Sequence, residues 1–354
     1  MIHPWLQPTW TRLVELGERL PHALLFVGPA GLGKRELAEA LAARLLCDAP
    51  RADGHACDQC EPCQWRLTGN HPDLKSLVPA AELAAATTEG EGEGEPAARE
   101  TGAKAASTQI VIDQVRALQA ALNVTGHHGS RRVVVVDPAE AMNGYTANAL
   151  LKLLEEPPVG CVFVLVSSAP RRLLPTIRSR CQQWLFARPD EAARAHWAAH
   201  ADKEARALLA LGSGMPLAAE RLAQAGGAAL HARFVRDIGA LQAADALRLA
   251  AQWEAWLRSK EALAAGFGLP ELADWMQRWV GDLAALRLGG RVRFFPAQEA
   301  VLAALASRMS VAAASACYNE LAQIRKVSRH PLSLRLVLED MLMRYTRAVA
   351  GARG

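Results

Sequence analysis

The chain has 354 residues, which is enough for two or three domains with a sizeable core. Half of the residues are hydrophobic (51%), yet no apolar run reaches the ~18 residues that a membrane span needs. The first residues lack the apolar core of a signal peptide, so we expect a cytoplasmic protein. The net charge of +4 is too small to indicate nucleic-acid binding by itself.

The first predicted elements are a strand, a loop and a helix near the N-terminus. Residues 22–28 (HALLFVG) form an apolar run that predicts a short buried strand. A helix is predicted from residue 34 onward, because leucines recur every four residues at Leu37, Leu41 and Leu45. The sequence GPAGLGK lies between the two elements. In such a strand–loop–helix context, backbone N–H groups at the helix N-terminus can wrap phosphates.

The loop departs from the phosphate-binding pattern G-x-x-x-x-G-K-[ST] at one position. Gly28, Gly33 and Lys34 match the pattern, whereas Arg35 replaces the hydroxyl residue that ligates Mg2+. A guanidinium has no acceptor atom and cannot coordinate a cation. We therefore expect Mg2+ binding and catalysis to be lost. Binding of ATP or ADP stays open, because Lys34 and the loop amides can still hold an anion.

Four of the seven cysteines lie close together in the sequence and predict a metal site. Cys47, Cys57, Cys60 and Cys63 have the spacing C-x9-C-x2-C-x2-C. Two x2 spacings allow thiolates to converge on one tetrahedral ion, and four thiolates are typical of a closed, structural Zn2+ site. His55 is a weaker candidate ligand. The alternative is that the four are reduced cysteines packed as small side chains.

A compositionally biased insert precedes the rest of the predicted α/β pattern. Residues 79–107 are low in complexity and nearly free of large apolar side chains, so we expect a disordered, acidic surface insert. Beyond it, apolar strands alternate with amphipathic helices, which is typical of a parallel sheet with helices on both faces. The predicted elements are a helix at 110–123, a strand at 131–137, a helix at 146–156 and a strand at 161–168.

The composition changes after Pro189, where alanine and leucine predominate and no strand is predicted. We expect an α/β domain at 1–187, a small helical domain at 188–228 and a larger helical domain at 229–354. The last predicted helix starts near Pro331. Its apolar stripe either faces the core or contacts another subunit, and it comprises Leu334, Leu338, Met341, Leu342 and Tyr345.

Asp137 ends an apolar strand downstream of the loop, where ATPases of this class hold a Mg2+-associated acid. Enzymes that hydrolyse ATP usually place a glutamate directly after it, but here the next residue is Pro138 and the nearest acid is Glu140. Losing both the metal ligand and the water-orienting acid should slow catalysis on the order of 10^3-fold or more. The alternative is that Asp137 caps a helix.

The segment PTIRSRC at 175–181 contains two arginines, Arg178 and Arg180. We expect a subunit-facing loop here, from which an arginine can reach a neighbour's γ-phosphate and stabilise its charge in trans. Taken alone, two such arginines are more often ion-paired surface residues.

Together these segments resemble the clamp-loader branch of the AAA+ ATPases. The resemblance rests on GPAGLGK, the four-cysteine module, VVVVDPAEAMN, ANALLKLLEEPP and LLPTIRSRC. It spans residues 22–185, interrupted by the acidic insert. It implies an AAA+ P-loop domain with an inserted zinc module, followed by a small helical lid and an all-α collar domain.

Within that branch the sequence is similar to the δ′ subunits of bacterial DNA polymerase III rather than to the τ/γ motor subunits. Motor subunits carry Thr or Ser in place of Arg35 and Asp-Glu in place of Asp137-Pro138. Their second sensor arginine aligns with Met215 when Gly212-Ser213 is matched to the family's Gly-Ser pair. The motif Ser179-Arg180-Cys181 is intact. The resemblance therefore implies a non-hydrolysing subunit whose Arg180 is an arginine finger for a neighbouring motor subunit.

The resemblance also implies partners, namely τ/γ and δ subunits in a hetero-pentamer that loads a sliding clamp at primer-template DNA, with no membrane. One alternative is an ATP-hydrolysing, τ/γ-like motor subunit with an unusual loop. Another is a zinc-dependent DNA-binding protein. Against that alternative, the module carries few basic residues, Arg51 and Arg66 at its margins, and no evident recognition helix.

Overall fold

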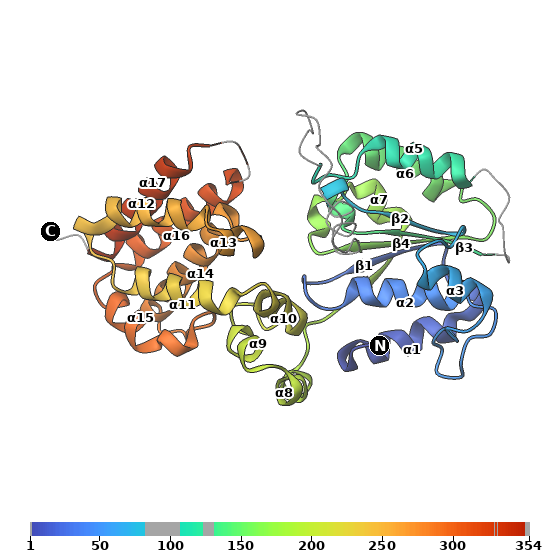
Figure 1. The fold of residues 1–354 in the computed structure, drawn as a ribbon, viewed down its shortest axis with the longest axis horizontal. Coiled ribbons are helices and arrows are strands. Elements are labelled where there is room, and N and C mark those ends of the chain that lie inside the picture. The colour runs from blue at the N-terminus through green and yellow to red at the C-terminus, as the bar shows by residue number, and fades with distance from the viewer. Residues whose placement is uncertain (1, 82–106, 123–130, 329, 331, 351–354) are drawn as a thin grey trace, which may run out of the picture. The chain divides into compact units, whose positions relative to one another are not determined.

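The computed structural model describes residues 2–81, 107–122, 131–328, 330 and 332–350 (Figure 1). The chain divides into two compact units, Met1–Ala193 and Arg194–Gly354. Nearly all of the predicted acidic insert at 79–107 lies outside the described residues. The predicted division of the helical part at residue 228 stays a prediction.

The described part of the first unit contains a five-stranded sheet in the order β2-β3-β4-β1-β5. Each neighbouring pair is parallel. Parallel neighbours need a crossover connection, which the helices between the strands provide. The strands are β1 (Ala23–Val27), β2 (Leu74–Leu77), β3 (Arg132–Val136), β4 (Cys161–Ser167) and β5 (Gln182–Leu185).

Helices cover both faces of this sheet, as the alternating pattern predicts (Figure 1). On one face, alternate strand residues such as Phe163 and Leu165 are fully buried in one apolar cluster with residues of α5, α6 and α7. The other face carries α2, which contacts β3 and β4. The helices of this unit are α1 (Gln7–Leu16), α2 (Lys34–Leu46), α3 (Glu61–Leu67), α5 (Ile112–Leu122), α6 (Gly144–Glu155) and α7 (Pro175–Arg180).

In the described part of the second unit, all regular elements are helices, which confirms the sequence prediction. Helix α8 (Glu191–His200) begins just before the boundary between the units. The others are α9 (Lys203–Leu208), α10 (Pro216–Gln224), α11 (Gly227–Gly239), α12 (Ala246–Leu257), α13 (Lys260–Ala264), α14 (Leu269–Arg287), α15 (Glu299–Ala306), α16 (Val311–Val327) and α17 (Leu334–Ala350).

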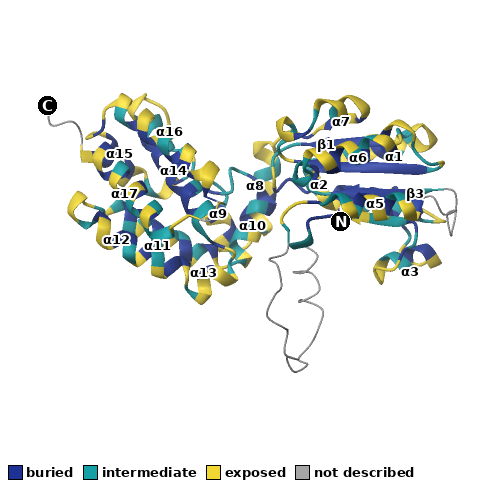
Figure 2. Ribbon diagram, turned by 90° about the horizontal axis from the view of Figure 1, so that it is seen from above, coloured by how far each residue is buried: buried dark blue, intermediate teal, exposed yellow. Residues whose placement is uncertain are grey.

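Aromatic side chains fill the core of the second unit, and Figure 2 shows the buried strips along its helices. Trp253, Trp279 and Phe234 are fully buried there. The indole N–H of Trp279 donates to the hydroxyl of Tyr345 at 3.0 Å, so the buried polar atoms of this pair are satisfied. The core-facing interpretation of the stripe on α17 is confirmed for Leu338, Met341, Leu342 and Tyr345, which are all buried, while Leu334 is half-buried.

Among the described helices, none combines the length and the apolar character that crossing a membrane would require.

Candidate functional site

The phosphate-type loop joins β1 to α2, as the sequence predicts, and its shape depends on glycine. Gly33 precedes the first residue of α2 with a φ of 91°, in the left-handed region that glycine adopts without strain. A Cβ on Gly28 would lie 2.9 Å from both Cβ and the carbonyl oxygen of Phe186. Any side chain at Gly28 would therefore push apart the loop and the end of β5.

Lys34 is folded back into this loop and is only 4% exposed. Its Nζ donates to the carbonyl oxygens of Gly28 at 2.8 Å and Pro29 at 2.7 Å, and to Oγ of Ser168 at 3.0 Å. An ammonium has three N–H donors, and these three bonds account for all of them. A phosphate could bind Lys34 only by displacing one of these acceptors.

Arg35 lies between two carboxylates beside the loop. Its Nε is 3.1 Å from Oε1 of Glu39 and 3.6 Å from Oδ2 of Asp137. The structure thus brings Asp137, at the end of β3, next to the loop as predicted. An arginine guanidinium pairs with this acid, and the N-cap residue of the adjacent 3-10 turn is Pro138, which makes no side-chain capping hydrogen bond. The charge that Mg2+ would neutralise is met by Arg35.

Two further residues bear on hydrolysis, namely Glu140, the acid nearest to Asp137 in the sequence, and Met215, which aligns with the second sensor arginine of motor subunits. Oε1 of Glu140 accepts a hydrogen bond from the backbone N–H of Ser168 at 3.0 Å, so this carboxylate is bound to the end of β4. Met215 belongs to the second unit, where it is 2% exposed and carries no charge. The predicted loss of the water-orienting acid is thus consistent with the geometry.

Arg180 is the last residue of α7. The predicted loop is therefore wrong, because residues 175–180 form a short helix that leads directly into β5. Nη2 of Arg180 forms an ion pair with Oε1 of Glu155, the last residue of α6, and Nη1 donates to the carbonyl oxygen of Thr176 at 3.3 Å. The side chain of Arg180 is 37% exposed. It is held in place while one part of it still faces solvent.

The two residues that flank Arg180 fix the end of α7. Oγ of Ser179 donates to the carbonyl oxygen of Thr176 at 3.0 Å. Cys181 is buried, and burial raises the pKa of its thiol to about 12, so it remains a neutral packing group. Both residues therefore support the position of the arginine.

The four predicted cysteine ligands meet at one point. Their sulfur atoms all lie within 4.8 Å of one another. Cys47 Sγ is 3.8 Å from Cys60 Sγ, and Cys57 Sγ is 3.9 Å from Cys63 Sγ. A regular tetrahedron of sulfurs around a metal at about 2.3 Å has edges of about 3.8 Å. The four cysteines could therefore hold a metal ion after shifts of about 1 Å or less in the distances between their sulfurs.

His55 does not join this cluster, so its assignment as a weaker ligand is not supported by the geometry. Its ring stacks on Trp10 with centroids 4.9 Å apart. The indole N–H of Trp10 donates to the carbonyl oxygen of Asp53 at 3.2 Å, and Nη1 of Arg44 donates to that of Gly54 at 3.0 Å. The segment between the first two cysteines is thus fixed to α1 and α2, and His55 serves this attachment.

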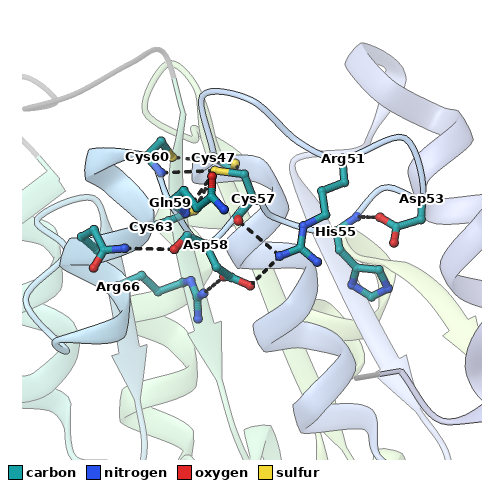
Figure 3. A network of polar contacts seen from close by, with 11 residues as sticks. Cys47, Arg51, Asp53, His55, Cys57, Asp58, Gln59, Cys60, Cys63 and Arg66 are labelled. Atoms are coloured by element: carbon teal, nitrogen blue, oxygen red, sulfur yellow. Dashed lines mark hydrogen bonds and ion pairs between the residues drawn. The ribbon is translucent and has the colours of Figure 1, made fainter.

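Local hydrogen bonds and burial set the acidity of the thiols (Figure 3). The backbone N–H groups of Gln59 and Cys60 donate to Sγ of Cys57 and lower the pKa of that thiol to about 6. Burial raises the pKa of Cys47 and of Cys63 above the ordinary value. Cys57 is therefore poised as a thiolate, while Cys47 and Cys63 lose their protons only when a cation compensates the charge.

Comparison with known proteins places the chain in a family. A family model described as DNA polymerase III, delta subunit, matches residues 10–190. DNA polymerase III subunit delta′ of Pseudomonas aeruginosa is 40% identical over 285 residues, or 78% of this chain and 76% of the relative. The chain belongs to the delta′ subunit family of bacterial DNA polymerase III.

Other relatives match over shorter stretches. The delta′ subunit of Escherichia coli K12 is 35% identical over 198 residues, which covers 55% of this chain and 52% of that protein. The tau subunit of Bacillus subtilis is 28% identical over 173 residues, or 49% of this chain and 26% of its own length. Among solved structures, a protein of Thermotoga maritima related to the gamma subunit aligns with 97% of this chain and 99% of its own, at a TM-score of 0.46 and 19% identity.

Sequence reasoning missed several residues that shape these sites. Glu155 is paired with Arg180 across a gap of 25 positions, and Trp10 contacts the cysteine module from a separate helix. Glu155 is the first of the two acids that end LLKLLEE, and nothing in that segment links it to an arginine.

Proposed function

We propose that this delta′ family member is a non-hydrolysing subunit of a clamp loader and lends Arg180 to the ATP site of a neighbouring τ/γ motor subunit. Family membership supports the assignment to DNA polymerase III. The observation that carries the non-hydrolysing part is the pair between Arg35 and Asp137, 3.6 Å apart, where a motor subunit would place Mg2+ between a hydroxyl and an acid.

The expected absence of ATP hydrolysis at this chain's own loop follows from the charge of Arg35 and from the acceptors to which Lys34 donates. Mg2+ bridges the phosphates and neutralises the charge that develops during transfer, and a guanidinium cannot replace an oxygen ligand of the metal. The three N–H groups of Lys34 donate to protein acceptors, and the carboxylate of Glu140 accepts from the backbone N–H of Ser168. We expect turnover at this chain's own loop to be slower than in a motor subunit on the order of 10^3-fold or more.

The surroundings of Arg180 suit an arginine that acts on another molecule. Its ion pair with Glu155 lies at the surface, where such pairs contribute about 0–1 kcal/mol. Exchanging that carboxylate for a phosphate therefore costs little, and charge-assisted hydrogen bonds to phosphate are among the stronger polar contacts. Before such an exchange, Glu155 and the carbonyl oxygen of Thr176 restrict the Arg180 side chain to a small part of its conformational space.

The remaining partners follow from the family rather than from contacts. We propose that the helices of the second unit join a collar with τ/γ and δ subunits in a hetero-pentamer, and that the assembly loads a sliding clamp onto primed DNA. In the cysteine module we propose a structural Zn2+, held by Cys47, Cys57, Cys60 and Cys63. A closed four-thiolate shell leaves no open position, so this ion would supply folding energy and no chemistry.

Reconstitution with τ/γ and δ subunits tests the finger. In assemblies that contain Arg180→Ala, we expect kcat at the one ATP site served by Arg180 to fall on the order of 10^3-fold. The DNA-stimulated ATPase would then retain at most the turnover of the remaining sites. Arg172→Ala is the matched control, because Arg172 is an exposed arginine in the preceding turn. Both variants should assemble as the unchanged chain does, as measured by gel filtration.

An assembly that keeps its full ATPase rate with Arg180→Ala, while being intact, would reject the finger. The rival function is a motor-like subunit that hydrolyses ATP, and the retention of Lys34 is the feature that favours it. That rival predicts ATP turnover by the isolated chain, abolished by Lys34→Ala. Our proposal predicts only a background rate in isolation.

A further inference from the structure

The short turn between two of the cysteine ligands contains a residue in an uncommon backbone conformation. Asp58 has a φ of 59°, and Ser213 is the other non-glycine residue with positive φ among the residues that the structure describes. The left-handed region is unfavourable for most side chains, and aspartate and asparagine are the residues that tolerate it best after glycine. Something must therefore hold Asp58 in this conformation.

The conformation of Asp58 determines where the following N–H groups point. The backbone N–H groups of Gln59 and Cys60 donate to Sγ of Cys57 at 3.4 and 3.3 Å, and the N–H of Cys57 donates to Sγ of Cys47 at 3.3 Å. Hydrogen bonds to a thiolate favour its charged form. The turn through Asp58 thus pre-forms the half of the site that includes Cys57.

Three side chains converge on Asp58 from two sides (Figure 3). Nη2 of Arg66, on α3, donates to Oδ1 at 2.6 Å. Nη2 of Arg51 is 3.4 Å from Oδ2 and also donates to the carbonyl oxygen of Cys57 at 3.2 Å. Nε2 of Gln64 donates to the backbone carbonyl oxygen of Asp58 at 2.9 Å. Each contact is weak alone at the surface, but all of them restrain the same residue.

We propose that Asp58, held by Arg51 and Arg66, is a positioning residue for the metal site. This inference rests on the proposed function of the four cysteines as metal ligands. The ion pairs of Asp58 with Arg51 and Arg66, called the bridge below, join the loop before Cys57 to α3, which carries Cys63. The bridge therefore fixes the distance between the cysteines of the loop and the cysteine of the helix. Two arginines and one carboxylate also leave a net charge of about +1 beside a centre that carries about −2 when four thiolates bind a divalent cation, which favours the occupied state.

Metal release from the full-length chain tests this role. The zinc-loaded protein is mixed with a chromogenic chelator at neutral pH, and the release rate is compared among variants. For Asp58→Ala we expect release on the order of 10-fold faster or more, because residues that orient metal ligands typically affect affinity by 10–100-fold. Asp58→Asn keeps an oxygen acceptor and tolerance of positive φ, so it should restore most of the slow rate. Glu61→Ala, an exposed acid of the same module, is the control and should release at the unchanged rate.

Asp58→Gly separates the turn from the bridge, because glycine adopts the conformation freely but offers no carboxylate. Fast release by Asp58→Gly supports the bridge, and release at the unchanged rate would overturn the proposal. Cobalt substitution adds a spectroscopic signature, since its absorption bands should broaden in Asp58→Ala if the tetrahedral arrangement loosens. If the unchanged protein carries no metal, the proposed zinc site fails and this inference fails with it. If it carries metal that every Asp58 variant retains equally well, only the inference fails.

Discussion

The α/β unit contains two places suited to a divalent cation, and the chain treats them in opposite ways. At the phosphate-type loop the acid Asp137 is paired with the chain's own Arg35. At the cysteine module four sulfurs lie at separations of a tetrahedral metal site, and arginines approach only the outer edge of the cluster. At the first place a guanidinium lies where a cation could pair with the acid, whereas the second offers four sulfurs that could hold one. The difference separates a loop that keeps its shape around an internal ion pair from a cluster of side chains suited to a metal.

The largest effect on this comparison is expected from removing one of the four sulfurs of the cysteine module. Cys63→Ser leaves three thiolates and a hydroxyl, which should lower the metal content from roughly one ion per chain to nearly none. Structural zinc contributes on the order of 10 kcal/mol to small domains, so residues 47–63 should also become sensitive to protease. Elemental analysis and limited proteolysis measure both effects. Cys317→Ser, in the second unit, is the control that should keep the metal.

Acidity should act on the cysteine module. Cys57 has a pKa near 6 and is already a thiolate at neutral pH, whereas Cys47 and Cys63 have raised pKa values and must lose protons on metal binding. Metal affinity should therefore rise as the pH rises from 6 to 8, on the order of 10-fold per unit for each displaced proton. Competition titrations at several pH values measure the slope. A flat profile would contradict the assignment of these thiols as ligands.

The smallest expected effect concerns the pair at the loop. Arg35→Gln and Asp137→Asn should each reduce the free energy of unfolding, with a coupling between them of about 0.2–1 kcal/mol, as for other partly exposed pairs. A double-mutant cycle by denaturant unfolding gives this coupling. Glu39→Gln is the control for the second partner of Arg35. Zero coupling would mean that Arg35 does not compensate the acid, and the explanation for the lost metal would have to change.

The central strands could be predicted from the sequence, and the edge strands could not, for a physical reason. β1, β3 and β4 have neighbours on both sides and read as apolar runs, whereas β2 (LKSL) and β5 (QQWL) lie at the edges of the sheet. Edge strands are exposed on one side and accept polar residues, so their sequences lack the continuous apolar run that indicates a buried strand. The short helix before β5 was missed because six residues carry too little periodicity to tell a helix from a loop.

The four cysteines of the module could be predicted as a cluster because their spacing in the sequence is short and local. The exclusion of His55 as a ligand could not be predicted from the sequence, because it depends on stacking against Trp10, 45 positions away. The partner of Arg180 and the bonds of Lys34 are likewise tertiary, and spacing alone contains no information about them. Sequence patterns therefore predicted which residues could carry chemistry, and the fold determined which of them already have partners within the chain.

The parallel pairing of β1 with β5 has a further consequence. Leu24 pairs with Gln182 and Val27 with Leu185, so Arg180 lies before one end of this strand pair and the phosphate-type loop follows the other end. Three residue steps along a strand span roughly 10 Å. Arg180 is anchored upstream of its own strand while the loop opens downstream, so the two lie at opposite ends of this strand pair.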